Sequence, residues 1–338
     1  MASNIYGADL GTCNLKVYSK SSDSVVSIKN TIAIKGKNQI YAYGDDAYAM
    51  YEKAPSDINV SFPVVRGVIS DFNNMQNLIF ELITNYAHGK IKNAEFIVAV
   101  PTAITEVEKK AFHDLFYKNK YKAKKVLLCE KPIADAVGLG LDVTEPTGRM
   151  IVDIGADTTE ISVISLKGLV ISDLLSIGGN KIDESIATYL KRNFNLLIGQ
   201  KTAMQLKESL ASAKEGEVLS DVVVGRDVVS GLPIEQEITS DIIYEAIKDN
   251  VNSICNSIKL VLEKTPPELA RDIIRDGIYL TGGSSKITKL DELCTDLTNI
   301  QVNTCEFPME SVVLGLNTIV SDPKYSGLGY ELKSKIFS

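Results

Sequence analysis

Residues 6–19 read YGADLGTCNLKVYS, and residues 152–165 read VDIGADTTEISVIS. In both stretches an aspartate, Asp9 or Asp153, stands two residues before a glycine, Gly11 or Gly155. Polar and apolar residues then alternate, which is typical of a half-buried β-strand. Each stretch therefore predicts a strand, a tight turn and a second strand. The two aspartates are 144 residues apart in a chain of 338, so we expect two copies of one structural plan.

Strands and helices alternate around the first stretch. Residues 95–101 (EFIVAVP) indicate a buried strand, and residues 105–118 indicate a helix with Thr105 as N-cap and Glu108 in the capping-box position. Residues 124–141 (KKVLLCEKPIADAVGLGL) predict a strand that runs into a helix.

The second half repeats this alternation. Residues 240–264 predict a long amphipathic helix with Ser240 as its N-cap, and residues 277–283 (GIYLTGG) predict a strand that ends on two glycines. Alternating strands and helices predict an α/β fold with largely parallel or mixed sheets, built as two duplicated halves.

The composition narrows the class of protein. Hydrophobic residues make up 45% and charged residues 23%, as in ordinary globular proteins, and the net charge of −7 argues against nucleic acid as a partner. No apolar run approaches the roughly 18–20 residues of a membrane helix, and MASNIYGADLG lacks the pattern of a secretory signal. The cysteines, an odd number without metal-ligand spacing, are expected to be reduced and buried in a cytoplasm; they are Cys13, Cys129, Cys255, Cys294 and Cys305.

The two aspartate turns have the chemistry of phosphate binding. Consecutive N–H groups in a glycine turn form a nest for anions, and small side chains let a phosphate approach closely. The carboxylates of Asp9 and Asp153 would repel that phosphate unless a cation such as Mg²⁺, held mainly through water, lay between them. A single D-x-G turn is usually structural, but two copies at matching places favour two facing loops on one polyphosphate.

A third glycine element follows, and two familiar nucleotide motifs are missing. Residues 280–286 (LTGGSSK) end a strand on two glycines, which suits a nucleoside pressed against the backbone. Neither G-x-x-x-x-G-K-[ST] nor G-x-G-x-x-G occurs, which argues against a P-loop or a dinucleotide-binding domain.

Two phosphate hairpins with a strand-end double glycine resemble the superfamily of actin, sugar kinases and heat-shock chaperones. Within it the chain is most similar to the MreB family of bacterial actins over nearly its whole length. Residues 7–18 (GADLGTCNLKVY) look like the family's G-I-D-L-G-T-A-N-T-L-V-Y. Further matching segments, all in the family's order, are VVRGVISDF, VAVPTAITEVEKKAF, VDIGADTTEISVISLKGLV, SIGGNKIDESI, GRDVVSGLP, TPPELARDIIRDGIYLTGG and SVVLGLN.

The resemblance implies an actin-like ATPase fold, in which two duplicated domains, each with a large and a small subdomain, surround a nucleotide cleft. Domain I would hold residues 1–148, with a small subdomain at about 30–65 and the segment from about 315 to 338 packed back on it. Domain II would hold residues 149–314, with a small subdomain at about 181–242.

The resemblance also implies which residues bind ATP or ADP with Mg²⁺. The first phosphate loop would use Gly11, Thr12, Cys13, Asn14 and Lys16, and the second Gly155, Ala156, Asp157 and Thr158. The remaining nucleotide contacts would come from Gly178, Gly179, Lys207, Glu208, Gly282, Gly283 and Ser284. Asp9 and Asp153 would act on the metal through water, with Asp153 and Thr158 also in the catalytic group.

The chain departs from the family at the catalytic pair. Where MreB reads E-E-P, this chain reads Glu130, Lys131 and Pro132, so a lysine replaces the glutamate that positions the attacking water in the family. Asp157 adds a carboxylate to the second loop. We therefore expect weak ATP hydrolysis. The divergent pair, the frequent Lys, Asn and Ile and the absence of Trp resemble paralogues carried by wall-less, spiroplasma-type bacteria.

The expected function is that of a cytoskeletal protein that polymerises into protofilaments and supports cell shape or the motility of helical cells. Its partner would be itself, with other MreB paralogues as an alternative, in the cytoplasm and not on nucleic acid. Residues 330–338 (YELKSKIFS) could form a weak amphipathic turn at the inner face of the membrane or a solvated tail. The alternative function is a small-molecule kinase of the same superfamily; a chaperone would need a further C-terminal domain.

Overall fold

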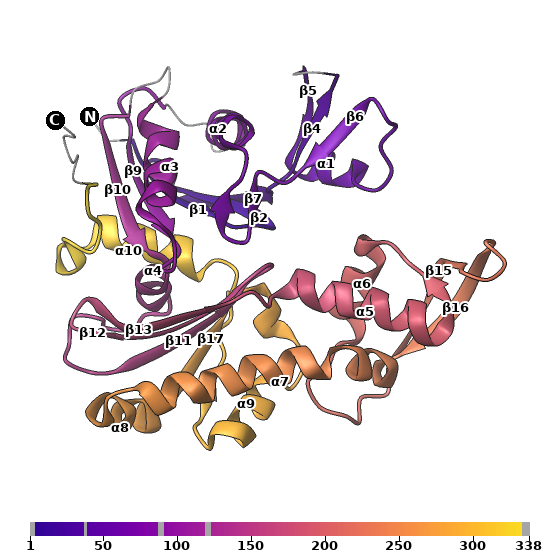
Figure 1. The fold of residues 1–338 in the computed structure, drawn as a ribbon. Coiled ribbons are helices and arrows are strands. Elements are labelled where there is room, and N and C mark those ends of the chain that lie inside the picture. Colours follow the sequence, from indigo (N-terminus) through magenta and orange to yellow (C-terminus); the bar gives the residue numbers. More distant parts are fainter. Residues whose placement is uncertain (1–3, 37–38, 87–90, 119–122, 333–338) are drawn as a thin grey trace. The chain divides into compact units, whose positions relative to one another are not determined.

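The computed structural model describes residues 4–36, 39–86, 91–118 and 123–332. The chain forms two compact units (Figure 1). Unit 1 comprises residues 1–147, 164–170 and 309–338, and unit 2 comprises residues 148–163 and 171–308. Each unit is built around a five-stranded sheet, as the duplicated pattern predicts.

The sheet of unit 1 has the order β10-β9-β1-β2-β3. Its strands are β1 (Ile5–Leu10), β2 (Asn14–Ser19), β3 (Ser24–Lys29), β9 (Glu95–Val100) and β10 (Lys125–Glu130). β10, β9 and β1 are parallel, whereas β1, β2 and β3 are antiparallel, which confirms the predicted mixed sheet. The predicted strand, turn and strand over residues 9–19 is the β1–β2 hairpin.

Helices of unit 1 pack on this sheet. They are α2 (Phe72–Glu81), which continues as a π-helix η1 (Leu82–Tyr86), α3 (Glu106–Tyr117), α4 (Lys131–Gly138) and α10 (Ser311–Ser321). The predicted capping box of α3 is confirmed, because Thr105 and Glu108 exchange both hydrogen bonds. α4 and α10 lie side by side (Figure 1), with Gly138 against the Ser311 carbonyl and Gly315 against the Ala134 carbonyl. A Cβ at either glycine would overlap that carbonyl, so only glycine allows this contact.

A smaller sheet of unit 1 has the order β5-β4-β6. It consists of β4 (Ile32–Lys35), β5 (Gln39–Tyr43) and β6 (Ile58–Ser61), with α1 (Gly44–Met50) beside it. A two-stranded ribbon, β7 (Val64–Val65) and β8 (Val68–Ile69), leads back to α2, and η3 (Pro323–Tyr325) follows α10.

The sheet of unit 2 has the order β13-β12-β11-β17-β18. Its strands are β11 (Arg149–Ile154), β12 (Thr159–Ser165), β13 (Gly168–Leu175), β17 (Ile278–Thr281) and β18 (Val302–Asn303). The predicted second strand, turn and strand is thus β11 and β12, and the predicted strand with a double glycine at its end is β17. A short 3₁₀-helix η2 (Gly283–Lys286) follows β17.

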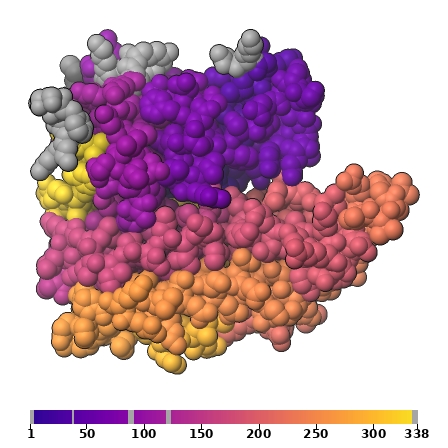
Figure 2. Space-filling view, viewed as in Figure 1, coloured from indigo at the N-terminus to yellow at the C-terminus, as the bar shows by residue number. Residues whose placement is uncertain are grey.

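A second, smaller sheet of unit 2 has the order β14-β15-β16. It contains β14 (Leu196–Leu197), β15 (Ser220–Asp227) and β16 (Pro233–Thr239), next to α5 (Gly179–Phe194) and α6 (Gln200–Leu210). β15 and β16 form an antiparallel hairpin whose turn carries exposed Val228, Val229 and Leu232. In Figure 2 this turn, in orange, stands out from the surface.

Three further helices complete unit 2: α7 (Ser240–Lys264), α8 (Pro267–Asp276) and α9 (Leu290–Thr298). The prediction that Ser240 caps α7 is wrong, because the N-cap is Thr239 and its side chain makes no capping bond. The Ser240 hydroxyl donates instead to the Glu217 carbonyl and accepts from the Leu219 amide. The Ser240 hydroxyl is thus used in a tertiary contact and not in the helix cap that the local sequence predicts.

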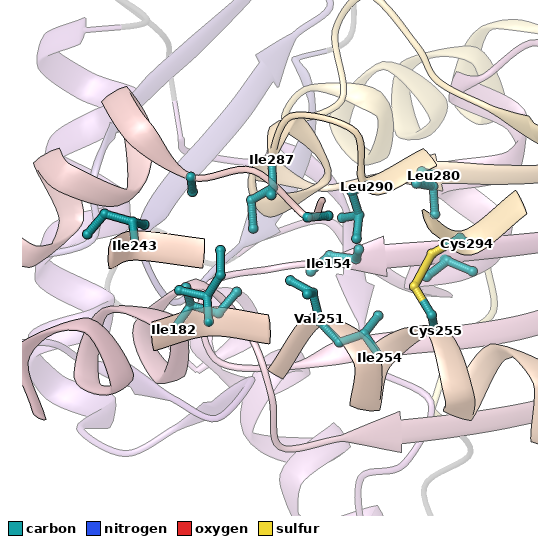
Figure 3. Close-up of a cluster of buried hydrophobic side chains, with 14 of the residues drawn as sticks. Ile154, Ile182, Ile243, Val251, Ile254, Cys255, Leu280, Ile287, Leu290 and Cys294 are labelled. Carbon is teal, nitrogen blue, oxygen red and sulfur yellow. A yellow bond between two sulfur atoms is a disulfide. The ribbon is translucent and has the colours of Figure 1, made fainter. Parts of the chain in front are cut away.

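The core of unit 2 forms where α7 crosses beneath the sheet. Its buried side chains include Ile154 from β11, Ile182 from α5, and Val251 and Ile254 from α7 (Figure 3). Spacings of three and four residues along α7 keep these aliphatic groups on one face of the helix. The core fixes the ends of β11 and β17, where the glycine loops begin.

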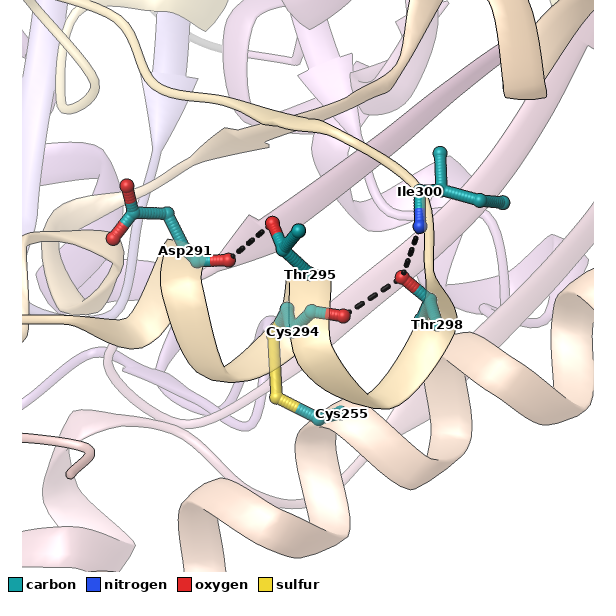
Figure 4. The surroundings of a disulfide bond; sticks show 6 residues. All are labelled: Cys255, Asp291, Cys294, Thr295, Thr298 and Ile300. Carbon is teal, nitrogen blue, oxygen red and sulfur yellow. Dashed lines mark hydrogen bonds between the residues drawn. A yellow bond between two sulfur atoms is a disulfide. The ribbon is translucent and has the colours of Figure 1, made fainter.

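A disulfide joins Cys255 of α7 to Cys294 of α9 (Figure 4). The prediction of reduced thiols is therefore wrong for these two residues, which are 39 positions apart and have their Cα atoms at 5.2 Å. Sequence spacing could not reveal the pair, because packing of α7 on α9 brings it together. Cys129 is a buried free thiol, whereas Cys13 and Cys305 are partly exposed rather than buried.

Among the described residues no helix is long and apolar enough to cross a membrane. Most of the C-terminal turn that could touch a membrane lies outside the described residues, which end at Leu332. Leu332 itself packs against the core of unit 1.

Candidate functional site

The β1–β2 hairpin carries a buried ion pair at the base of its turn. Asp9 and Lys16 are cross-strand partners, and the Lys16 Nζ lies 2.9 Å from the Asp9 Oδ2. Both side chains are buried, at 7% and 10% exposure. Burial alone would raise the pKa of Asp9, but the ammonium groups of Lys16 and Lys131 outweigh it and hold that pKa below its usual value.

The turn next to this pair is held by contacts with Lys29 and Asn30. The Asn30 side-chain amide donates to the Gly11 carbonyl at 2.7 Å, and the Asn30 backbone N–H donates to the Cys13 carbonyl at 2.9 Å. Lys29 Nζ lies 3.5 Å from the Cys13 sulfur. Gly11, Thr12, Cys13 and Asn14 remain partly exposed, so the predicted first phosphate loop is a fixed turn that is open to solvent.

Glu130 and Lys131 stand where β10 passes into α4, and their side chains have different surroundings. The Tyr330 hydroxyl donates to Glu130 Oε1 at 3.1 Å, and Lys109 Nζ lies 3.8 Å from the same oxygen. Burial raises the pKa of Glu130 despite these partners. Lys131 acts electrostatically on Asp9 instead. Glu130 is therefore engaged by α3 and the C-terminal segment, while Lys131 belongs to the surroundings of the first loop.

The second loop, between β11 and β12, is tied to the start of α5. The Gly155 N–H donates to the Thr158 carbonyl at 2.9 Å and closes the turn. The Gly155 carbonyl accepts from the Gly179 N–H at 3.0 Å, and Asn180 donates to the Asp157 carboxylate at 2.7 Å. The helix start thus faces the loop, and its backbone groups fix the loop's shape.

The strand-end glycines complete a cluster within unit 2. The Ser284 hydroxyl donates to the Gly155 carbonyl at 3.1 Å. A Cβ at Gly179 would lie 2.8 Å from the Ser284 Oγ and 3.0 Å from the Lys207 Nζ. Gly282 has a φ of +84°, and a Cβ there would overlap the Asp153 carboxylate. Four segments that are distant in sequence therefore meet with little space between them.

Lys207 and Glu208 are neighbours in sequence but face different surroundings. Lys207 Nζ donates to the Gly179 carbonyl at 3.1 Å and pairs with Asp183 at 2.9 Å. Burial raises the pKa of Asp183 to about 6, although Lys207 pulls it down. Glu208 is exposed and lines an open groove between α6 and β15. Sequence reasoning missed Asp183, although its place four residues after Gly179 puts it one helical turn inside α5.

The predicted site residues thus fall into two groups. Unit 1 brings together Asp9, Gly11, Thr12, Cys13, Asn14, Lys16 and Lys131, and unit 2 brings together Asp153, Gly155, Ala156, Asp157, Thr158, Gly178, Gly179, Lys207, Gly282, Gly283 and Ser284. Glu130 accepts a hydrogen bond from Tyr330 instead, and Glu208 is exposed to solvent.

A divalent cation would have few protein ligands at these loops. No cluster of three or more His, Cys, Asp or Glu side chains within the described ranges could hold a metal ion. Each loop offers one buried aspartate, and Asp9 already accepts a bond from Lys16. The residues fit a Mg²⁺ held by phosphate oxygens and water, and they do not fit an all-protein metal site.

Comparison with known proteins shows to which family this chain is similar. The sequence pattern of the family described as MreB/Mbl protein matches residues 3–326. The cell shape-determining protein MreB of Escherichia coli K12 is 36% identical over 323 residues, covering 93% of this chain and 92% of that protein. The Bacillus subtilis protein Mbl is 34% identical, covering 94% and 95%.

Solved structures of similar proteins support the same family. Spiroplasma citri MreB 5 bound to AMPPNP has a TM-score of 0.90 and 32% identity, covering 94% of this chain and 96% of that one. The MamK double helical filament has a TM-score of 0.76 at 21% identity, which shows a shared fold. The chain therefore belongs to the MreB/Mbl family and has the actin-like fold, built of two duplicated halves.

Proposed function

We propose that the protein binds ATP through its two hairpin loops, polymerises into protofilaments and hydrolyses ATP slowly. The observation that carries the nucleotide part is the cluster of Gly155, Gly179, Gly282 and Ser284, where four distant segments of unit 2 meet without large side chains. The absence of bulky side chains suits the close approach of phosphate and ribose to the backbone. The relative MreB 5 of Spiroplasma citri was solved with AMPPNP and with ADP, which supports the proposal.

Both hairpins are assigned to one nucleotide, with four subdomains around it as the resemblance implies. Asp9 and Asp153 would each orient water on a Mg²⁺ ion, which neutralises phosphate charge when bound. Lys16 can offer a further N–H to a phosphate oxygen while it keeps its bond to Asp9. Thr158 has a hydroxyl that could contact the attacking water.

Slow hydrolysis follows from Lys131. Attack on the γ-phosphate needs a water held in line by an acceptor that helps to take up its proton. A protonated lysine has three donors and no acceptor, so it cannot do this. Glu130 is no replacement, because Tyr330 and Lys109 already hold its carboxylate.

The Lys131→Glu variant tests the catalytic part. Restoring a carboxylate should raise phosphate release by about 10²–10⁴-fold, the usual contribution of a positioned base. Phosphate release from excess ATP and Mg²⁺ is measured by a coupled phosphate assay. Lys248→Met is the matched control, because Lys248 is a helix lysine paired with Glu245 on α7. An unchanged rate in Lys131→Glu would contradict the assigned role of Lys131.

Polymerisation is proposed from two apolar surfaces at the ends of unit 2. The β15–β16 turn exposes Val229 at 80% and Leu232 at 64% and leads through β16 into the start of α7. Ile274 of α8, which follows the end of α7, is exposed at 64%. α7 has 25 residues, so about 37 Å of helix separates the two surfaces. A contact between unlike ends that does not close into a ring extends into a filament.

Sedimentation with ATP and Mg²⁺ over a range of concentrations tests assembly. The wild type should pellet above a critical concentration, whereas Val229→Asp should stay in the supernatant at about tenfold higher concentrations, because a charge in an apolar contact is costly. Val218→Asp is the matched control, since Val218 is exposed at 96% outside the hairpin turn. A wild type that stays monomeric in every nucleotide state would contradict the proposal.

The cellular role proposed is support of cell shape or of helical-cell motility from the cytoplasm, at the inner face of the membrane and with other paralogues as partners. The relatives named as cell shape-determining proteins support the first of these roles.

A further inference from the structure

Three parallel strands of unit 1 end together beside Asp9. Ala8 and Leu128 are both level with Val98 in the sheet, so Asp9 lies in the same row as Cys129. Lys131 begins α4 two residues later, at the carboxyl edge of these strands. This edge is where α/β sheets bind their ligands. Backbone register therefore puts Lys131 next to the first loop.

Asp135 shares a helix face with Lys131. The two residues are four positions apart in α4, which extends from Lys131 to Gly138, and side chains at this spacing face each other. Asp135 is 0% exposed, although its neighbours on α4 are small or aliphatic. A carboxylate is almost never fully buried unless it is paired. Neither residue is without a partner in the structure.

Asp9 also contacts a second lysine, Lys16, on the neighbouring strand β2. Lys16 is buried and lies 2.9 Å from the Asp9 carboxylate, and Lys131 is near enough to act electrostatically on the same carboxylate. The four side chains are those of two aspartates and two lysines.

We propose that Lys16 and Lys131 supply fixed positive charge that a bound triphosphate would otherwise take from a divalent cation, and that Asp135 is the positioning residue that holds Lys131 there. The inference rests on the proposed nucleotide site and adds to it a weak dependence on Mg²⁺. Ammonium groups that are already in place cost no reorganisation when phosphate binds, and lysine is a common phosphate ligand.

Equilibrium binding of a fluorescent ATP analogue to the full chain, in Mg²⁺ and in EDTA, tests this. The measured quantity is the ratio of the two dissociation constants. In the wild type this ratio should stay below about tenfold, whereas Lys131→Met should raise it to about 100-fold, the effect of one nearby unit charge in a partly buried site. Lys131→Arg keeps the charge and should restore the wild-type ratio. Lys248→Met is again the matched control and should leave it unchanged.

The positioning role of Asp135 is read from the same ratio. Asp135→Asn should raise it by several-fold without removing binding in Mg²⁺, and Asp135→Glu should restore part of the loss. Thermal unfolding followed by circular dichroism reports whether each variant folds; if Asp135→Asn does not fold, Asp135→Glu with its retained charge must still give a ratio below that of Lys131→Met.

Three outcomes would overturn the inference. A wild type that loses as much affinity in EDTA as Lys131→Met shows that the lysines do not replace the metal. A ratio in Asp135→Asn equal to that of the wild type removes the positioning role. No binding of the analogue in Mg²⁺ would contradict the proposed function itself, and the inference with it.

Discussion

The two aspartate hairpins share one backbone plan but differ in charge. In the β1–β2 hairpin, Asp9 is paired with Lys16 across the strands. The residue at the same offset from Asp153 is Glu160, which is also buried. The β11–β12 loop has a further carboxylate, Asp157, which accepts a hydrogen bond from Asn180. The first hairpin thus pairs its carboxylate with a lysine across the strands, whereas the second has acidic residues at three positions, Asp153, Asp157 and Glu160, and its turn is shaped by backbone and amide contacts.

This difference shows that two copies of one backbone element can be stabilised by different kinds of contact. Bare glycines and helix N–H groups shape the second loop, and fixed ammonium groups balance the first. If both loops bind one triphosphate, Lys16 and Lys131 of unit 1 supply it with positive charge from the protein. The predictions below break or sharpen this contrast, beginning with the largest effect.

Asp9→Ala should destabilise the protein by about 3 kcal/mol, because it leaves the buried Lys16 without its partner. Nucleotide binding should weaken as well. Urea unfolding measures the loss of stability, and the double variant Asp9→Ala with Lys16→Leu should recover part of it. Equal urea midpoints for the wild type and Asp9→Ala would show that the pair does not stabilise the first hairpin.

Asp153→Ala should weaken Mg²⁺-ATP binding about fivefold, which corresponds to about 1 kcal/mol. The physical reason is the loss of the carboxylate that would orient metal-bound water at the second loop. Calorimetric titration with an ATP analogue measures the affinity. Unchanged affinity in both Asp9→Ala and Asp153→Ala would mean that the hairpins are not the nucleotide site.

Asp183 should make the second unit less stable as pH rises from about 4 to 6. Its folded pKa of about 6 lies above the ordinary value, so the folded state holds a proton that the unfolded state has lost in this window. Stability from this group is present at lower pH and is lost as pH rises through 6. The attraction of Lys207 is already included in that pKa, and the change in stability should be on the order of 1 kcal/mol. Urea unfolding of Asp183→Asn at pH 4 and 7 should show a smaller difference than the wild type; an identical pH dependence contradicts the prediction.

Asp157→Gly should tighten ATP binding by about threefold, the smallest of these effects. The variant removes one partly exposed carboxylate near the second loop, where solvent screens most of its repulsion. The affinity should be compared at low and high salt, because the gain should shrink as salt rises. Weaker binding in Asp157→Gly would indicate that its bond to Asn180 matters more for the loop than its charge does.

Local pattern predicted much of the fold, and tertiary contacts account for what it missed. The β1–β2 and β11–β12 elements, β9, β17 and the capping box of α3 all follow from alternation, glycine turns and capping residues. The prediction of a Ser240 cap was wrong because the Ser240 hydroxyl donates to the Glu217 carbonyl. The disulfide was not predicted because only packing brings α7 and α9 together. Asp135 and Asp183 were missed as members of the site. The i,i+4 spacing of Asp135 from Lys131 could have revealed the first, whereas the partner of Asp183, Lys207, lies on another helix.

A crystal structure of the full chain with AMPPNP tests the central claim most directly. The account predicts a triphosphate in contact with the β1–β2 and β11–β12 loops, with the Lys131 Nζ within hydrogen-bond distance of the γ-phosphate and Glu130 still bonded to Tyr330. A nucleotide that contacts neither loop, or a Lys131 side chain turned to solvent while Glu130 holds the attacking water, would contradict it.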